Sequence, residues 1–242
     1  MFQWYQRIGL SICLILLLAT MPAYAVEVFK VSKTGGAVQI WFEAEAFDAR
    51  EPEGDKFFPI AGEEGGTPKP PKGAFGKAVT RTGGAGGRLI YTFDISKTNG
   101  GKKGTWYFWG RLINPNNQSD YLLVKGDDKK IPDTAPFPGG DEVPPFLNAD
   151  DRIFEANVAG WGWDGGAREG HPKELQNGEN TMYIYHRQGN TSRFMDVFVW
   201  TNNSGYRPTD ADYEAAKELK ANQAVDPASK LATVWGHIKS SR

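Results

Sequence analysis

Hydrophobic and polar residues alternate with a period of two over most of the chain between residues 37 and 200. Alternation at every second position is typical of β-strands that bury one face. Glycine-rich and proline-rich stretches separate the alternating segments, and none of these stretches has the helical period that a parallel crossover needs. We therefore predict an all-β fold, an antiparallel β-sandwich of the jelly-roll type. Its predicted strands are 38–47, 88–94, 105–113, 120–125, 153–158, 180–186 and 193–201.

The pattern changes after Gly205. Thr209 and Asp212 have the spacing of a helix capping box, and residues 213–222 are rich in Ala, Glu and Lys. We therefore predict a short helical C-terminal tail over 206–242, following a sandwich domain over 26–205. A second helix of the tail carries an apolar stripe, which packs either on its own domain or on a protein partner. The stripe consists of Leu231, Val234, Trp235 and Ile238.

The first 25 residues have the features of a secretory signal peptide. Arg7 precedes an apolar run over 8–21, and Ala23 and Ala25 form the small-residue pattern of a cleavage site. Cleavage after Ala25 leaves a secreted, periplasmic or cell-surface protein with no membrane attachment. The alternative is an uncleaved N-terminal anchor. The only cysteine, Cys13, lies within the signal, so the mature chain has no disulfide.

Charge excludes one class of partner. The chain has 28 Lys+Arg against 29 Asp+Glu and a formal net charge of −1. Nucleic-acid binders need a basic excess, so we predict no nucleic-acid partner. Phosphate-loop, H-E-x-x-H, nucleophile-elbow and C-x-x-C motifs are also missing from the sequence.

Three carboxylates stand out within the predicted strands. Alternation over 38–47 places Trp41, Glu43 and Glu45 on one face, while Asp196 lies within the last predicted strand. An unpaired carboxylate among apolar side chains is costly. If the first and last strands are neighbours, the three carboxylates converge on one hard cation, for which calcium fits best. The alternative is that Glu43 and Glu45 form the solvated face of an edge strand. Asp196 is expected to share its face with Phe194, Phe198 and Trp200.

A succession of short motifs resembles the carbohydrate-binding modules of families 6 and 35 from about residue 39 to residue 201. The motifs are W-F-E-A-E-A-F at 41–47, F-G-K-A-V at 75–79, L-I-Y-T-F at 89–93, G-T-W-Y-F-W-G-R at 104–111, G-E-N-T at 178–181 and M-D-V at 195–197. The resemblance implies a galactose-binding-like β-sandwich with a sugar site formed mainly by loops. It also implies a structural calcium ion held by Glu43, Glu45 and Asp196.

A sugar site needs aromatic rings beside polar groups, because a pyranose has an apolar face and a rim of hydroxyls. The glycine-rich segment 158–166 contains Trp161 and Trp163 and reads as a loop at the rim of the sandwich. The two rings either stack on a sugar or fold back to plug the end of the sandwich. The polar residues expected beside them are Asp164, Arg111, Asn190 and Arg193.

These features predict a secreted, non-catalytic carbohydrate-binding module that has a structural calcium ion and binds a polysaccharide or other glycan. The alternative is a calcium-stabilised adhesion or surface-assembly protein that uses the same scaffold for protein contacts. A glycosidase would need two acids on opposite sides of the scissile bond. Glu43 and Glu45 project from one strand and cannot take those positions, so we predict that the protein is not an enzyme.

Overall fold

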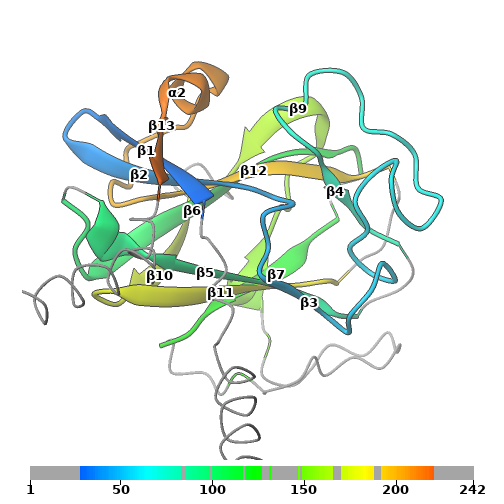
Figure 1. Ribbon diagram of the computed structural model, residues 1–242, viewed down its shortest axis with the longest axis horizontal. Helices are drawn as coiled ribbons and strands as arrows, with labels where there is room; N and C mark the ends of the chain where they lie inside the picture. The colour runs from blue at the N-terminus through cyan, green and yellow to red at the C-terminus, as the bar shows by residue number, and fades with distance from the viewer. Residues whose placement is uncertain are drawn as a thin grey trace, which may run out of the picture.

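The computed structural model describes residues 28–82, 86–98, 100–116, 118–126, 131, 147, 149–165, 170–187 and 192–220. The predicted signal peptide, the apolar stripe of the second tail helix and Asn190 lie outside these residues. Two antiparallel β-sheets face each other across a shared core (Figure 1). The predicted all-β sandwich is confirmed.

The larger sheet has eight strands, with the order β10-β6-β12-β2-β1-β13, and with β4 paired to β12 and β9 paired to β6. Its strands are β1 (Val28–Thr34), β2 (Ala37–Glu43), β4 (Val79–Thr80), β6 (Gly104–Asn114), β9 (Val158–Asp164), β10 (His171–Leu175), β12 (Phe194–Thr201) and β13 (Lys217–Lys220). The smaller sheet has five strands, with the order β3-β5-β11-β7-β8. Its strands are β3 (Ala49–Glu51), β5 (Arg88–Asp94), β7 (Asp120–Val124), β8 (Arg152–Ile153) and β11 (Glu179–Tyr185). Two short 3-10 helices, Ile95–Lys97 and Ala149–Asp151, lie in the connections.

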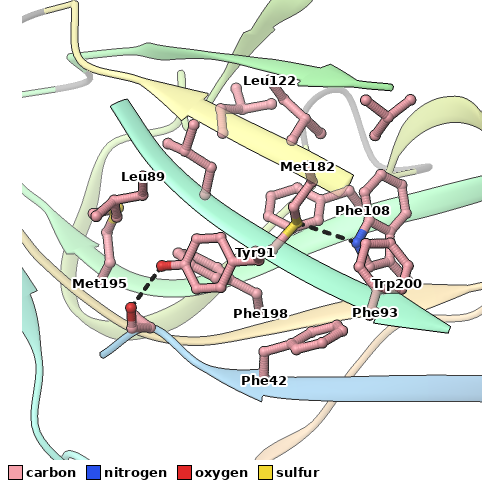
Figure 2. Close-up of a cluster of buried hydrophobic side chains, with 14 of the residues drawn as sticks. Phe42, Leu89, Tyr91, Phe93, Phe108, Leu122, Met182, Met195, Phe198 and Trp200 are labelled. Carbon is pink, nitrogen blue, oxygen red and sulfur yellow. Dashed lines mark hydrogen bonds between the residues drawn. The ribbon is translucent and has the colours of Figure 1, made fainter. Parts of the chain in front are cut away.

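The core between the sheets follows from the period-two pattern. On β2, Val38, Ile40 and Phe42 are buried in the core, whereas Trp41 packs on the opposite face. Aromatic and aliphatic side chains from both sheets interdigitate in the core (Figure 2). Because these side chains come from strands far apart in the sequence, they stabilise the fold through long-range contacts.

Two hydrogen bonds join the sheets inside this apolar core. Trp200 of the larger sheet donates its indole N–H to Sδ of Met182 in the smaller sheet, at 3.3 Å. Tyr91 of the smaller sheet donates its hydroxyl to the carbonyl of Ala44, next to β2, at 2.6 Å (Figure 2). Each polar group that the aromatic residues bring into the core therefore has a partner, which offsets the cost of burying it.

The outer face of the larger sheet is also covered. We call the buried side chains on this face the outer aromatic cluster: Trp41, Trp109, Val197, Val199, Tyr206 and Tyr213. Tyr206 and Tyr213 come from the C-terminal segment, whose helix α2 (Asp210–Ala215) lies above β1 and β2 (Figure 1). Residues 206–220 thus pack on the sandwich as part of it.

The predicted helical tail is only partly present. Thr209 and Asp212 form the predicted capping box, with Thr209 N–H donating to Asp212 Oδ2 at 3.0 Å and Asp212 N–H donating to Thr209 Oγ1 at 3.2 Å. The helix ends at Ala215, however, and residues 217–220 form β13, which pairs antiparallel with β1. The helical prediction is therefore wrong for residues 217–220, because pairing with the open backbone edge of β1 overrides their local helix propensity.

The described residues contain no helix that is both long enough and apolar enough to cross a membrane.

Gly110 on β6 is a packing constraint that a substitution can test. An added Cβ would overlap the ring of buried Phe154, which is itself packed between Phe108 and Phe198. We expect Gly110→Ala to lower the free energy of unfolding by about 1–3 kcal/mol, because an overpacked core must distort. Gly160→Ala on the neighbouring strand is the matched control, since nothing lies within 4 Å of its added Cβ. Urea denaturation of both variants measures the difference, and equal stability would contradict this account of the packing.

Candidate functional site

The three predicted carboxylates lie close together in the structure. Glu43 is the last residue of β2, and Val197 on β12 lies opposite it. The amide of Ala44 donates to the carbonyl of Asp196 at 2.8 Å, which extends this pairing beyond the strand. Glu45, Glu43 and Asp196 are near enough for their charges to affect one another. The first and last predicted strands are neighbours, as the convergence of these carboxylates requires.

The carboxylates surround the backbone of residues 75–77. The amide of Phe75 donates to both carboxylate oxygens of Asp196 at 3.2 Å, and the amide of Lys77 donates to Glu45 Oε1 at 2.6 Å. Between them, a Cβ at Gly76 would lie 2.6 Å from Glu45 Oε1 and 3.1 Å from Glu43 Oε2. A side chain at position 76 would therefore displace the carboxylate of Glu45 from its present position.

The face on which Asp196 lies differs from the prediction. We expected Asp196 to share a face with Phe198 and Trp200, but these two rings are in the core while Asp196 contacts the outer side. The register between β12 and β6 shifts between Met195 and Val197. This bulge inserts an extra residue and breaks strict alternation, so Asp196 turns outward.

Arg111 on β6 occupies the centre of the site. One of its terminal nitrogens contacts Asp196, while Nε and Nη2 donate to the two carboxylate oxygens of Asp210 at 2.8 Å each. Nη1 also donates to the carbonyl of Gly73 at 3.0 Å. The guanidinium lies over the rings of Phe75 and Trp161, at 4.3 and 5.0 Å from their centroids. Only 3% of Arg111 is exposed, so the side chain is committed to these partners.

The site has more negative than positive charge. Burial raises the pKa of Glu45 to about 7, and the nearby charges of Glu43 and Asp196 add to the shift. Burial also raises the pKa of Asp196 despite its contact with Arg111. Glu43 receives one hydrogen bond, from the hydroxyl of Tyr213 at 2.8 Å. Within the described residues, Glu45 Oε2 is buried and accepts no hydrogen bond.

This donor set suits calcium in its chemistry, because every side-chain ligand is a carboxylate oxygen. Glu43 and Glu45 are the residues that would hold the ion, together with Asp196. In the structure, however, Asp196 contacts Arg111. Within the described part of the chain, no group of three or more His, Cys, Asp or Glu side chains is arranged to hold a metal ion. The cluster is thus an acidic site of suitable chemistry rather than a closed coordination shell.

Trp161 and Trp163 lie on a strand, not in the predicted loop. Strand β9 pairs with β6, and Gly162 and Trp163 lie opposite Leu112 and Arg111. The glycines that suggested a loop alternate with the tryptophans, which therefore project to the same side.

Both indoles are half-buried and hydrogen-bonded. Trp161 donates its N–H to the carbonyls of Pro71 and Lys72 at 3.3 and 3.2 Å. Trp163 donates to Asp210 Oδ1 at 3.0 Å and lies edge-on to Trp41, with ring centroids 5.6 Å apart. Neither ring enters the core between the sheets. Both rest on the outer side of the larger sheet, with part of each ring still exposed.

Of the predicted polar partners, Arg111 lies over the ring of Trp161, whereas Asp164 and Arg193 are buried. Asp164 is 2% exposed and accepts a hydrogen bond from the amide of Ala156 at 3.0 Å. Arg193 is 1% exposed, and Arg111 holds the carboxylates described above. Buried side chains cannot reach a sugar on the surface. Asn190 lies outside the described residues. Of the six predicted sugar contacts, only Trp161 and Trp163 are shown with exposed surface.

Several residues that form the site escaped sequence analysis. Asp210 and Tyr213 belong to the capped helix α2, yet no local pattern connects them to Arg111 or Glu43, which lie some hundred or more positions earlier in the chain. Gly76 is one glycine among 29 in the sequence. Its only signal is its place in the F-G-K-A-V motif.

Comparison with known proteins gives matches among solved structures only. No family model matches the chain, and no curated protein does. The solved structures similar to it include the GH26-CBM35 β-(1,4)-mannanase of Podospora anserina, with 12% identity and a TM-score of 0.40 over 70% of this chain and 28% of the mannanase. The chain thus corresponds to less than a third of that enzyme.

Two further similar structures are carbohydrate-binding modules. The C-terminal CBM6 of a Zobellia galactanivorans laminarinase is 11% identical, with a TM-score of 0.38 over 68% of this chain and 99% of the module. A CBM35 of Cellvibrio japonicus is 11% identical, with a TM-score of 0.39 over 68% of this chain and 96% of the module. At these scores the likeness carries no functional inference, so function is argued below from the residues of this chain.

The two carboxylates that pair with Arg111 differ in burial. Replacing each one in turn compares the contribution of a buried ion pair to stability with that of a half-exposed one. Asp196 is completely buried, whereas the side chain of Asp210 is 50% exposed. In chelator, we expect Asp196→Asn to lower the free energy of unfolding by about 3 kcal/mol, because it leaves a buried guanidinium undercompensated. Asp210→Asn is expected to cost about 1 kcal/mol or less. Urea denaturation gives both values, and a larger loss for Asp210→Asn would contradict the role given to Asp196.

Proposed function

We propose that this protein is a secreted, non-catalytic carbohydrate-binding domain that binds a glycan on the outer side of its larger sheet and is stabilised by calcium. The observation that carries the proposal is the fixed, partly exposed indole of Trp161. Its N–H is held by the carbonyls of Pro71 and Lys72, and its ring packs near Phe194 with centroids 6.4 Å apart. A rigid aromatic ring with exposed surface provides a stacking platform for the apolar face of a pyranose at low entropic cost.

The acidic cluster supports this platform through the loop between them. Residues 75–77 contact the carboxylates, and two residues earlier Gly73 accepts a hydrogen bond from Arg111. A Cβ at Gly73 would lie 3.2 Å from Cδ1 of Trp161, so the loop and the indole are in close contact. The loop that holds Trp161 is therefore positioned by the same residues that we propose as calcium ligands.

Bound calcium would supply positive charge to Glu43 and Glu45 and fasten their strand to residues 75–77. A mature chain without disulfides gains loop stability from such an ion. Nothing in the site favours catalysis, because Glu43 and Glu45 project side by side from one strand end and face a backbone segment rather than a cleft.

Calcium addition gives the first test. We expect the melting temperature of the protein to rise with calcium and to fall on chelation, because the ion binds only the folded state. Glu45→Gln should remove the calcium dependence. Glu63→Gln is the control, since Glu63 is exposed and pairs with the side chain of Lys77 at 2.8 Å. Differential scanning calorimetry measures the effect, and a wild-type melting temperature equal in calcium and in chelator would remove calcium from the proposal.

Glycan binding gives the second test. A glycan array probed in calcium should identify a ligand, and calorimetry with that ligand should show about a five- to thirtyfold loss of affinity for Trp161→Ala, since a stacked ring contributes roughly 1–2 kcal/mol. Tyr183→Ala is the control, because Tyr183 is a half-buried aromatic residue on the other sheet. Circular dichroism confirms the fold of both variants. No binding by the wild-type protein to any glycan, or equal losses in both variants, would contradict the proposal.

A further inference from the structure

Trp163 extends the aromatic surface that begins at Trp161. The two residues are two positions apart on β9 and therefore project to the same side of the strand. At about 3.3 Å per residue, their side chains leave the backbone about 7 Å apart. Each ring is partly exposed on the outer side of the larger sheet. This side of β9 thus presents two neighbouring indoles.

Contacts with other elements hold the ring of Trp163 in place. Its N–H donates to Asp210 Oδ1 at 3.0 Å, and its ring lies edge-on to buried Trp41. Trp163 also lies opposite Arg111 in the pairing of β9 with β6. The guanidinium of Arg111 lies over the ring of Trp161 and donates to both carboxylate oxygens of Asp210. Because Arg111 and Asp210 fix the two indoles relative to each other, a ligand that stacks on both does not have to order them.

Asp210 provides a hydrogen-bond acceptor beside the ring of Trp163. An ionised carboxylate has about four acceptor positions. Within the described residues, three hydrogen bonds reach Asp210, from Nε and Nη2 of Arg111 and from the indole of Trp163. The side chain is 50% exposed, so a ligand can reach the remaining position. The hydrogen bond from Arg111 lowers the pKa of Asp210, so the group is an ionised acceptor at neutral pH.

The spacing of the two indoles limits what can contact both. A pyranose stacks its apolar face on one aromatic ring, while its hydroxyls need polar partners at the rim. One sugar residue is too small to cover two rings whose side chains leave the backbone about 7 Å apart. Neighbouring residues of a glycan chain follow one another at a comparable spacing. A ligand that uses both Trp161 and Trp163 is therefore an oligosaccharide or a polysaccharide.

We propose that the protein binds a glycan chain along β9, with one sugar residue stacked on Trp161 and the next stacked on Trp163. A hydroxyl of the second sugar donates a hydrogen bond to Asp210. This inference rests on the proposed glycan-binding function, in which Trp161 provides the first platform. It identifies the ligand class as a chain of linked sugars, whereas a site formed by Trp161 alone would bind a single terminal sugar.

The dependence of affinity on chain length tests the second platform. The probes are glucose, galactose, mannose and xylose, each as the monomer and as its linear oligomers from dimer to hexamer, titrated in calcium by calorimetry. For a sugar that binds, we expect the oligomers to bind at least about fivefold more tightly than the monomer, because they add a second stacked ring.

Variants of Trp163 separate a sugar contact from a structural role. Trp163→Ala should remove most of the gain from chain length while changing the affinity for the monomer much less, because Trp161 remains. Trp163→Tyr keeps an aromatic ring and should restore most of the gain. A purely structural role would instead weaken the monomer and the oligomers equally. If Trp163→Ala does not fold, the wild-type series and the tyrosine variant decide the question.

Asp210→Asn tests the acceptor. We expect about a tenfold loss of affinity for the oligomers, because a hydrogen bond to a charged group is replaced by one to a neutral amide. Glu214→Gln is the matched control, since Glu214 is an exposed residue of the same helix and its replacement removes the same charge. It should bind the oligomers as the wild-type protein does.

Two results distinguish this inference from the function on which it rests. Equal affinities of the wild-type protein for monomer and oligomers, or an unchanged gain from chain length in Trp163→Ala, would overturn the second platform and leave glycan binding at Trp161 intact. Failure of every one of these sugars to bind would also overturn it. Absence of binding to any glycan on the array would overturn both proposals.

Discussion

The contact of Arg111 with Asp196 and Asp210 is the interaction on which the outer side of the larger sheet depends. It joins β6, β12 and helix α2, and it also holds the carbonyl of Gly73. The guanidinium provides planar, bidentate recognition of Asp210 while contacting a buried carboxylate on its other side. Replacing Arg111 would leave Asp196 buried without its counter-charge, so the stability of Asp196 in this position depends on Arg111.

Arg111 connects the acidic cluster to the exposed indole. Its guanidinium stacks over Phe75, whose amide binds Asp196, and it lies over the ring of Trp161. Carboxylates, loop and tryptophan thus form one packed unit in which each part restricts the others. For glycan recognition, such pre-organisation matters because a ring that is already fixed loses little conformational freedom on binding.

The acidic cluster has buried carboxylates whose pKa values are raised by burial. It has a surplus of carboxylates and a buried oxygen of Glu45 that accepts no hydrogen bond within the described residues. Buried charged groups need compensation, and where the protein does not provide it, a cation is the natural complement of a cluster of carboxylates.

The local pattern was sufficient to predict the sandwich, the faces of β2 and the capping box at Thr209, because each depends on residues near one another in the sequence. Three features misled the sequence analysis. The glycines around Trp161 suggested a loop, the bulge at Asp196 reversed the expected face, and residues 217–220 form a strand despite their helix propensity.

The sequence by itself therefore determined the fold class, whereas the pairing of β2 with β12 that brings the three carboxylates together is decided by the tertiary structure. Only the tertiary structure decided that Arg111 is buried among these carboxylates, that Arg193 faces the interior and that the two tryptophans lie on a strand. The physical reason is that periodicity reports which residues are buried, whereas ion pairs, bulges and edge pairing depend on partners from distant parts of the chain.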